Sequence, residues 1–283
     1  MTILSISNEL QKQIAIKSDH ISVFVQSEID DFLQQDDQFL LIYRSAEKIL
    51  NKNCFVAIKN IGFCRNKAVF EAFIKLFGRF YGVVEYTGIK LDCNYTGCSY
   101  NALTLHNDDA VDLNNPKYTF IQVLSEDPNG DTFGWNGVVK IDDIFEYLSI
   151  HDKGLLDKLF NYPFPMLSFG ISAYSNDREE IILKEPILTY HKEKLRVRFD
   201  LSRIKHFYFK KEIQMPDEEI LILDKFLAIC QKFRKRYYLS KGDILIVDNH
   251  RTLHDREETT IELDERGNLI SREIFVSFTY EKE

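Results

Sequence analysis

Short apolar runs separated by polar turn residues constrain the fold of this chain more than any other feature of its sequence. From Tyr86 onward such runs recur, rich in β-branched and aromatic residues. They span residues 118–124, 138–141, 181–183, 195–199, 244–247 and 270–280. Strands of this length with polar breaks are typical of a sandwich or barrel rather than a doubly wound parallel sheet. We therefore expect a mainly β fold with flanking helices.

Helical periodicity marks the rest of the chain. Apolar residues at helical spacing, with charges between them, predict amphipathic helices within residues 23–51. Residues 54–58 read as a strand, and residues 67–80 as a helix. Two helical inserts are expected at residues 141–160 and 217–238. Without repeats or linkers, residues 1–283 are expected to form a single domain, with residues 1–51 a helical N-terminal extension packed on its core.

The end of the chain predicts a β-hairpin with an inward arginine. Residues 259–263 and 269–278 flank a loop that contains Gly267 and Asn268, which tolerate positive φ. Side-chain alternation in the second strand puts Arg272 on the same face as three apolar residues. A guanidinium that faces a core needs an anion.

Composition excludes several classes of protein. Hydrophobic residues at 45% and charged residues at 28% describe a soluble globular protein, and the net charge of -8 argues against nonspecific nucleic-acid binding. Five scattered cysteines without a CxxC pair make a disulfide framework or zinc ribbon unexpected and favour the reducing cytoplasm. Residues 1–16 do not resemble a secretory signal, and no apolar run is long enough for a membrane helix.

Two distant segments carry residues that bind metals. His106 and Asp108, two positions apart at a predicted strand end, share a face and can offer an imidazole and a carboxylate to one ion. A bare H-x-D tripeptide occurs often by chance. Residues 242–254 form a glycine turn, a strand and a polar segment in which His250 or His254 can supply a second imidazole.

A third segment adds a polar turn. Residues 127–135 contain Pro, Asn and Gly, which account for a β-turn by themselves, followed by Thr132 and the only tryptophan, Trp135. The order H-x-D, G-D-T with a nearby Trp, G-D-x-L-x-x-D-N-x-R-x-L-H and an inward arginine resembles the TauD/TfdA group of iron(II)- and 2-oxoglutarate-dependent dioxygenases, which includes clavaminate synthase-like enzymes. The resemblance spans about residues 55–278 and implies a double-stranded β-helix core, a jelly roll similar to that of the cupins.

The resemblance implies a metal site. Iron(II) would be held by His106, Asp108 and His254, a triad that leaves three positions for 2-oxoglutarate and O2. His254 closes the R-x-L-H pattern, which leaves His250 at a variable position. Related halogenases have a small residue in place of Asp108, so the carboxylate favours hydroxylation.

The resemblance also implies residues for 2-oxoglutarate. Thr132 would donate a hydrogen bond to its distal carboxylate, and Arg272 would pair with that carboxylate bidentately. Arg266 is the competitor, because it fits the usual spacing from the distal histidine better. We prefer Arg272, since Arg266 falls in the predicted hairpin loop. Arg256 is a further candidate near the cosubstrate, although a surface salt bridge explains it equally well.

Charge suggests residues for the substrate. Similar lysine halogenases and amino-acid hydroxylases hold ammonium groups with acidic side chains and carboxylates with arginine. Candidates for the ammonium group are Asp109, Glu85 and Asp200. Arg196 and Arg198 alternate on one strand face and are candidates for an anion clamp, with solvated strand charges as the alternative. Asn268 is a candidate of lower rank.

These residues predict hydroxylation of a small amino-acid-like substrate, such as free lysine, ornithine or arginine. The family also oxidises sulfonates, aryloxy acids and carrier-tethered amino acids, which are the alternatives within the same chemistry. Halogenation is a third outcome, and a non-enzymatic metal-binding scaffold a fourth. A scaffold would have no need for Thr132 and Arg272 together.

Overall fold

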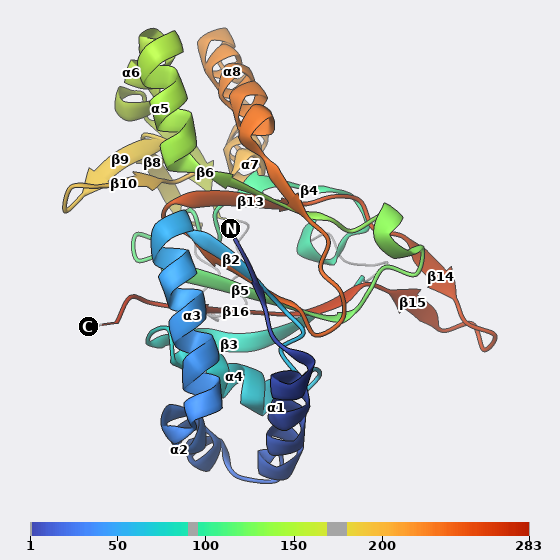
Figure 1. Cartoon of the computed structure of the whole chain (residues 1–283). Helices are drawn as coiled ribbons and strands as arrows, with labels where there is room; N and C mark the ends of the chain where they lie inside the picture. The colour runs from blue at the N-terminus through green and yellow to red at the C-terminus, as the bar shows by residue number, and fades with distance from the viewer. Residues whose placement is uncertain (1, 90–95, 169–179, 283) are drawn as a thin grey trace.

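Two facing β-sheets form the centre of the protein (Figure 1). The computed structural model describes residues 2–89, 96–168 and 180–282. The larger sheet has the order β1 (Ile3–Ser5), β2 (Phe55–Lys59), β12 (Ile244–Asp248), β5 (Tyr118–Ser125), β16 (Glu273–Thr279), β3 (Phe80–Thr87). The smaller sheet has the order β11 (Lys235–Tyr237), β6 (Asn136–Lys140), β13 (Thr252–Arg256), β4 (Leu103–His106). This is the double-stranded β-helix core that the sequence predicted.

The N-terminal helices cover the outer face of the larger sheet (Figure 1). They are α1 (Asn8–Ile21), α2 (Gln26–Gln35) and α3 (Asp37–Asn53), joined there by α4 (Lys67–Lys75). Ser7, Asp36 and Asn66 begin three of them by accepting hydrogen bonds from backbone N–H groups of the first turn. The helices within residues 23–51 are confirmed, whereas the parallel pairing of β1 with β2 was not predicted.

A second group of helices covers the smaller sheet. It consists of α5 (Ile141–His151), α6 (Lys153–Asn161), α7 (Leu201–Lys210) and α8 (Asp217–Phe233). Two hairpins accompany them, β7 (Phe164–Leu167) with β8 (Ile182–Glu185) and β9 (Leu188–His191) with β10 (Lys194–Val197). Val139 and Leu253 of the sheet pack with Leu148 and Phe226 of the helices in one buried apolar cluster.

The two predicted helical inserts differ from the observed elements. The first is broken at Asp152, whose side chain accepts a hydrogen bond from the N–H of Leu155 and begins α6. The second ends at Phe233, because Arg234 is extended and binds Asp255 of β13, which draws the chain alongside the sheet as β11.

Apolar side chains also fill the space between the sheets. Ile121 of β5, Val138 of β6 and Val247 of β12 belong to this inner cluster, and Ile274 and Val276 pack against it. The predicted terminal hairpin is present as β14 (Ile261–Leu263) and β15 (Leu269–Ser271), which project from one end (Figure 1). Among the described helices, none has the length and apolar character needed to cross a membrane.

Candidate active site

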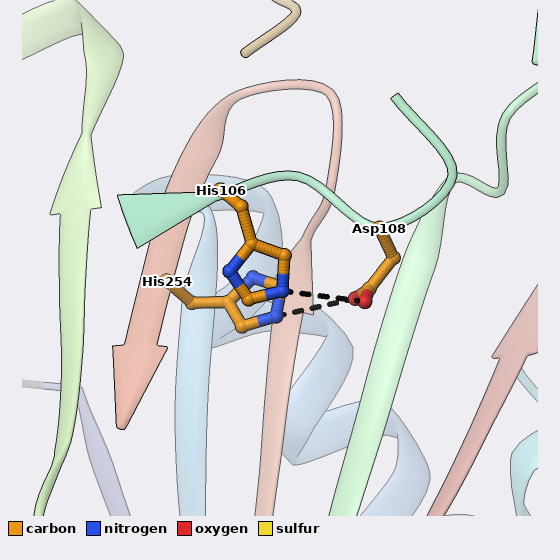
Figure 2. A group of neighbouring side chains, drawn as sticks. All are labelled: His106, Asp108 and His254. Carbon is orange, nitrogen blue, oxygen red and sulfur yellow. Dashed lines mark ion pairs between the residues drawn. The ribbon is translucent and has the colours of Figure 1, made fainter. Parts of the chain in front are cut away.

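His106, Asp108 and His254 meet on the inner side of the smaller sheet (Figure 2). His106 ends β4 and His254 lies directly opposite it on β13, so the strand pairing itself brings the two rings to 4.4 Å between centroids. Asp108 follows β4 by two residues. Its carboxylate lies 3.6 Å from Nε2 of His106 and 3.2 Å from Nε2 of His254. One nitrogen or oxygen of each residue lies within 4.8 Å of the others.

The orientation of His106 suits a metal. Its Nδ1 lies 2.8 Å from the backbone oxygen of Thr104 and donates to it, so Nε2, which faces Asp108, is the nitrogen that a metal can bind once its proton is lost. Burial alone would lower the pKa of His106, but the hydrogen bond and charge of Asp108 outweigh it and raise that pKa to about 9. Burial would raise the pKa of Asp108, but the two histidines hold it well below its usual range. A divalent cation would replace the proton shared by this group.

Two buried asparagines fix the segment that carries Asp108. The side chain of Asn249 accepts a hydrogen bond from the N–H of Asp108 at 2.8 Å and donates one to its backbone oxygen at 2.9 Å. Asn107 donates to the backbone oxygens of Asn249 and Thr252. The D-N of the downstream motif therefore ties the turn between β12 and β13 to the H-x-D segment.

Arg272 lies between β15 and β16 and is buried, with 7% of its surface exposed. Its guanidinium donates to Oδ1 of Asn136 at 2.9 Å. Burial lowers its pKa to about 9, and the charge of Arg256 adds to this effect. Within the described ranges no carboxylate forms an ion pair with Arg272. A side chain on Gly134 would approach its Cδ to 3.1 Å, so the backbone two residues after the G-D-T segment passes directly beside the arginine.

The other residues expected near the cosubstrate are placed differently. Thr132 ends a short 3-10 helix, Gly130–Thr132, and its side chain is exposed, two residues before Gly134. Arg256 is buried, but it donates to the backbone oxygens of Ser99 and Asn101, so it holds a loop rather than offering a free charge. Arg266 is exposed in the tip of the β14–β15 hairpin.

Among the acidic candidates, Asp109 directly follows Asp108 of the metal-binding group. It has a left-handed backbone (φ 48°), and its carboxylate accepts a hydrogen bond from Tyr81 Oη at 3.0 Å. Burial and the charge of Asp108 raise its pKa. Glu85 lies on β3 opposite Val276. Because the adjacent Val84 packs outward against the helices, Glu85 faces the space between the sheets.

Asp200 pairs in the backbone with His106, but its carboxylate is already used. It accepts hydrogen bonds from the N–H groups of Ser202 and Arg203 at the start of α7, and it lies 3.2 Å from Nε of Arg203. The helix start and the arginine thus already bind this carboxylate, and its expected role in holding an ammonium group stays a prediction.

The expected anion clamp of Arg196 and Arg198 also stays a prediction. Arg198 donates to the backbone oxygens of Ala110 and Asp112, and so holds the chain that follows the H-x-D segment. Burial lowers the pKa of Arg196, and the charges of Glu281 and Asp248 oppose this effect. Asn268 lies at the exposed hairpin tip, where Asp264 binds it. Alternation predicted the shared face of the arginines but not what that face contacts.

His250 does not join the site. It lies in the turn before β13, and its Nε2 is 3.1 Å from the backbone oxygen of Asn115. The residues that sequence reasoning missed are Thr119, whose hydroxyl binds Asp108, and Arg203, whose charge acts on Asp109. No motif contains either residue. One feature of the sequence could have pointed to Arg203, because it lies in the first turn of the helix that follows β10.

These residues fit a divalent metal beside a bound anion. Two imidazoles and one carboxylate form the donor set of iron(II) oxygenases and leave one side of the ion open. The buried guanidinium of Arg272 supplies the positive charge that a dicarboxylate requires.

Comparisons with known proteins agree with this geometry. Residues 28–270 match the taurine catabolism dioxygenase TauD, TfdA family. No curated protein sequence matches the chain. An asparagine oxygenase in complex with Fe(II), (2S,3S)-3-hydroxyasparagine and succinate is similar in structure, with a TM-score of 0.69, 15% identity and coverage of 99% of this chain and 94% of that one.

The non-heme iron oxygenase OrfP is also similar. Its complex with Fe, succinate and (3R,4R)-dihydroxy-L-Arg has a TM-score of 0.73 and 13% identity, and covers 99% of this chain and 94% of its own. Its complex with Fe and alpha-ketoglutaric acid has a TM-score of 0.70 and 14% identity, over 98% and 93% of the two chains. The chain belongs to the TauD/TfdA family of iron(II)- and 2-oxoglutarate-dependent dioxygenases.

Proposed function

We propose that this chain, as a single catalytic domain, hydroxylates an unactivated C–H bond of a small free amino acid, with a basic one such as lysine, ornithine or arginine as the first choice. The observation that carries the proposal is the convergence of His106, Asp108 and His254, together with a buried Arg272 that donates to Asn136 on β6, the strand paired with that of His254, and has no carboxylate partner among the described residues. Such a site holds a metal and an anion together.

Each residue has a distinct role in this proposal. His106, Asp108 and His254 hold iron(II), while Arg272 and Thr132 bind the distal carboxylate of 2-oxoglutarate. When bound, iron with 2-oxoglutarate and O2 supplies the oxidation, in which one oxygen atom becomes the substrate hydroxyl and the other enters succinate as CO2 leaves. The protein fixes the reacting groups and keeps water away.

The acidic residues of the candidate site support a cationic substrate. Asp109, directly after Asp108, offers a carboxylate that Tyr81 orients, and Glu85 on β3 faces the space between the sheets. Arg203 lies close enough to act on Asp109 and is our candidate for contact with the substrate carboxylate. The two similar oxygenases carry amino-acid products in their complexes, which agrees with an amino-acid substrate.

The alternatives separate on simple observations. A carrier-tethered amino acid, a sulfonate or another carboxylate would use the same iron chemistry. A non-enzymatic scaffold would form no succinate under any condition. Asp108 argues against halogenation, because a carboxylate occupies the position that a halide would need.

The test is a panel of free amino acids with iron(II), 2-oxoglutarate and O2. We expect one basic amino acid to stimulate succinate formation and to yield a product heavier by one oxygen atom. Asp109→Asn should raise KM for that substrate more than it lowers kcat, whereas Asp264→Asn in the exposed hairpin should change neither. If only a carrier-bound amino acid or a sulfonate reacts, the free-substrate proposal fails.

The cellular compartment is also a proposal. Cys54, Cys64 and Cys230 are free thiols, and Cys93 lies outside the described residues. Thiols that remain unpaired support the reducing cytoplasm that the sequence favoured.

A further inference from the structure

We propose that Thr119 is a positioning residue that makes Asp108 bind the metal through one oxygen only. The inference rests on the proposed iron site and adds a residue that no motif contains. Thr119 lies on β5 in the larger sheet, with 1% of its surface exposed. Its Oγ1 donates a hydrogen bond to Oδ2 of Asp108 at 2.6 Å. The larger sheet thus reaches across to a residue carried by the smaller one.

The sheet neighbours of Thr119 offer its hydroxyl no other hydrogen-bond partner among the described residues. Its neighbours in the sheet are Val247 on β12 and Phe278 on β16, both apolar. Ile121, the next residue on the same face of β5, belongs to the inner apolar cluster. A valine would pack equally well among these side chains. The hydroxyl is therefore explained by its contact with Asp108, which is its one hydrogen-bond partner within the described residues.

This hydrogen bond makes the two carboxylate oxygens of Asp108 different. Oδ2 accepts the hydrogen bond of Thr119 and lies 3.2 Å from Nε2 of His254, while Oδ1 faces Nε2 of His106 at 3.6 Å and has no other hydrogen-bond donor among the described residues. Asn249 holds both backbone groups of Asp108 at the same time. The carboxylate therefore cannot rotate without breaking the bond to Thr119, and Oδ1 is the oxygen left for the metal.

One-oxygen binding matters for the reaction that this site is proposed to perform. The triad leaves three positions on an octahedral ion, of which 2-oxoglutarate uses two and O2 one. A carboxylate bound through both oxygens would take one of these positions and compete with the cosubstrate or with O2. Thr119 thus keeps the third position open. Residues that hold a metal ligand by a hydrogen bond typically contribute about 10- to 100-fold to metal affinity.

The experiment measures metal binding without turnover. Co(II) is titrated under anaerobic conditions into wild type and into Thr119→Val, Thr119→Ser and Thr279→Val, with thermal unfolding as the check on folding. Thr279 is the matched control, because it is a buried threonine on the neighbouring β16 whose hydroxyl has no partner among described residues. We expect Thr119→Val to weaken Co(II) binding about 10- to 100-fold. Thr119→Ser should restore it to within about threefold of wild type, and Thr279→Val should bind as wild type does.

Two results would overturn the role of Thr119, and a third would also overturn the proposed metal site. Wild-type affinity in Thr119→Val would show that the hydrogen bond does not position Asp108. An equal loss in Thr119→Val and Thr279→Val would assign the effect to packing. If wild type itself fails to bind Co(II), or binds it unchanged in His106→Ala, the proposed metal site fails and the role of Thr119 fails with it.

Discussion

Replacing Arg272 by methionine is expected to stabilise the free protein while it removes 2-oxoglutarate binding. Burial lowers the pKa of Arg272 from 12.5 to about 9. At about 1.4 kcal/mol per pH unit, this corresponds to about 5 kcal/mol for keeping the guanidinium charged in its place. Its hydrogen bond to Asn136 returns about 1.5–3 kcal/mol. Methionine, of similar length, removes both the cost of burying the charge and the hydrogen bond to Asn136. The free protein should therefore gain about 2 kcal/mol in stability, or roughly 5 °C in Tm.

The same substitution should abolish the response to the cosubstrate. Losing one partner of a buried charge pair costs about 2–5 kcal/mol in binding. The Kd for 2-oxoglutarate should therefore increase by a factor between about 30 and several thousand. Thermal unfolding with Fe(II) under anaerobic conditions, at increasing 2-oxoglutarate, measures both effects. Wild type should gain about 2.7 kcal/mol at a concentration of 100 times its Kd, and Arg272→Met at most about 0.9 kcal/mol at the same concentration.

Arg266→Met is the matched control, because Arg266 is exposed in the hairpin loop and fits the family spacing. It should behave as wild type in both respects. A lower Tm for Arg272→Met combined with a full response to 2-oxoglutarate would refute the reasoning, and loss of that response in Arg266→Met would reassign the cosubstrate arginine.

Two further predictions concern stability. Lys117→Met leaves the carboxylate of Asp248 buried without its partner at 2.7 Å and should cost about 3 kcal/mol in urea unfolding, whereas Lys158→Ala breaks an exposed pair and should change stability by less than about 0.5 kcal/mol. Equal effects would contradict this distinction. Burial and the charge of Arg196 lower the pKa of His250 to about 3, so between about pH 6.5 and pH 3 the unfolded chain takes up a proton that the folded chain refuses. Wild type should therefore lose up to about 1.4 kcal/mol per pH unit more than His250→Gln as the pH falls below 6.5; parallel stability curves for the two proteins would show that His250 is not buried in its neutral form.

The sequence predicted the parts of the site that lie on strands in a fixed order. H-x-D at a strand end and the histidine of the downstream strand converge because β4 and β13 pair directly. Arg272 faces inward as alternation required, although the strand breaks at that residue. The hairpin loop was recognisable because Gly267 and Asn268 favour a turn.

The remaining roles depend on contacts between elements that the sequence does not relate. Arg196 and Arg198 share a face, but only the fold reveals that the chain after Asp109 already occupies the donors of Arg198. Asp200 looked available until α7 was seen to begin on it. Thr119 belongs to a mainly apolar strand that carries no motif, and its bond to Asp108 arises only where the two sheets face each other.

Succinate formation by four proteins tests the central claim most directly: wild type, His106→Ala, His254→Gln and His250→Gln. Each is supplied with iron(II), 2-oxoglutarate, O2 and the amino acid selected from the panel. Wild type and His250→Gln should form succinate and hydroxylated product in equal amounts, since His250 binds the backbone of Asn115 outside the converging group. His106→Ala and His254→Gln should form neither. Full activity in His254→Gln, with activity lost in His250→Gln, would contradict the site described for this chain.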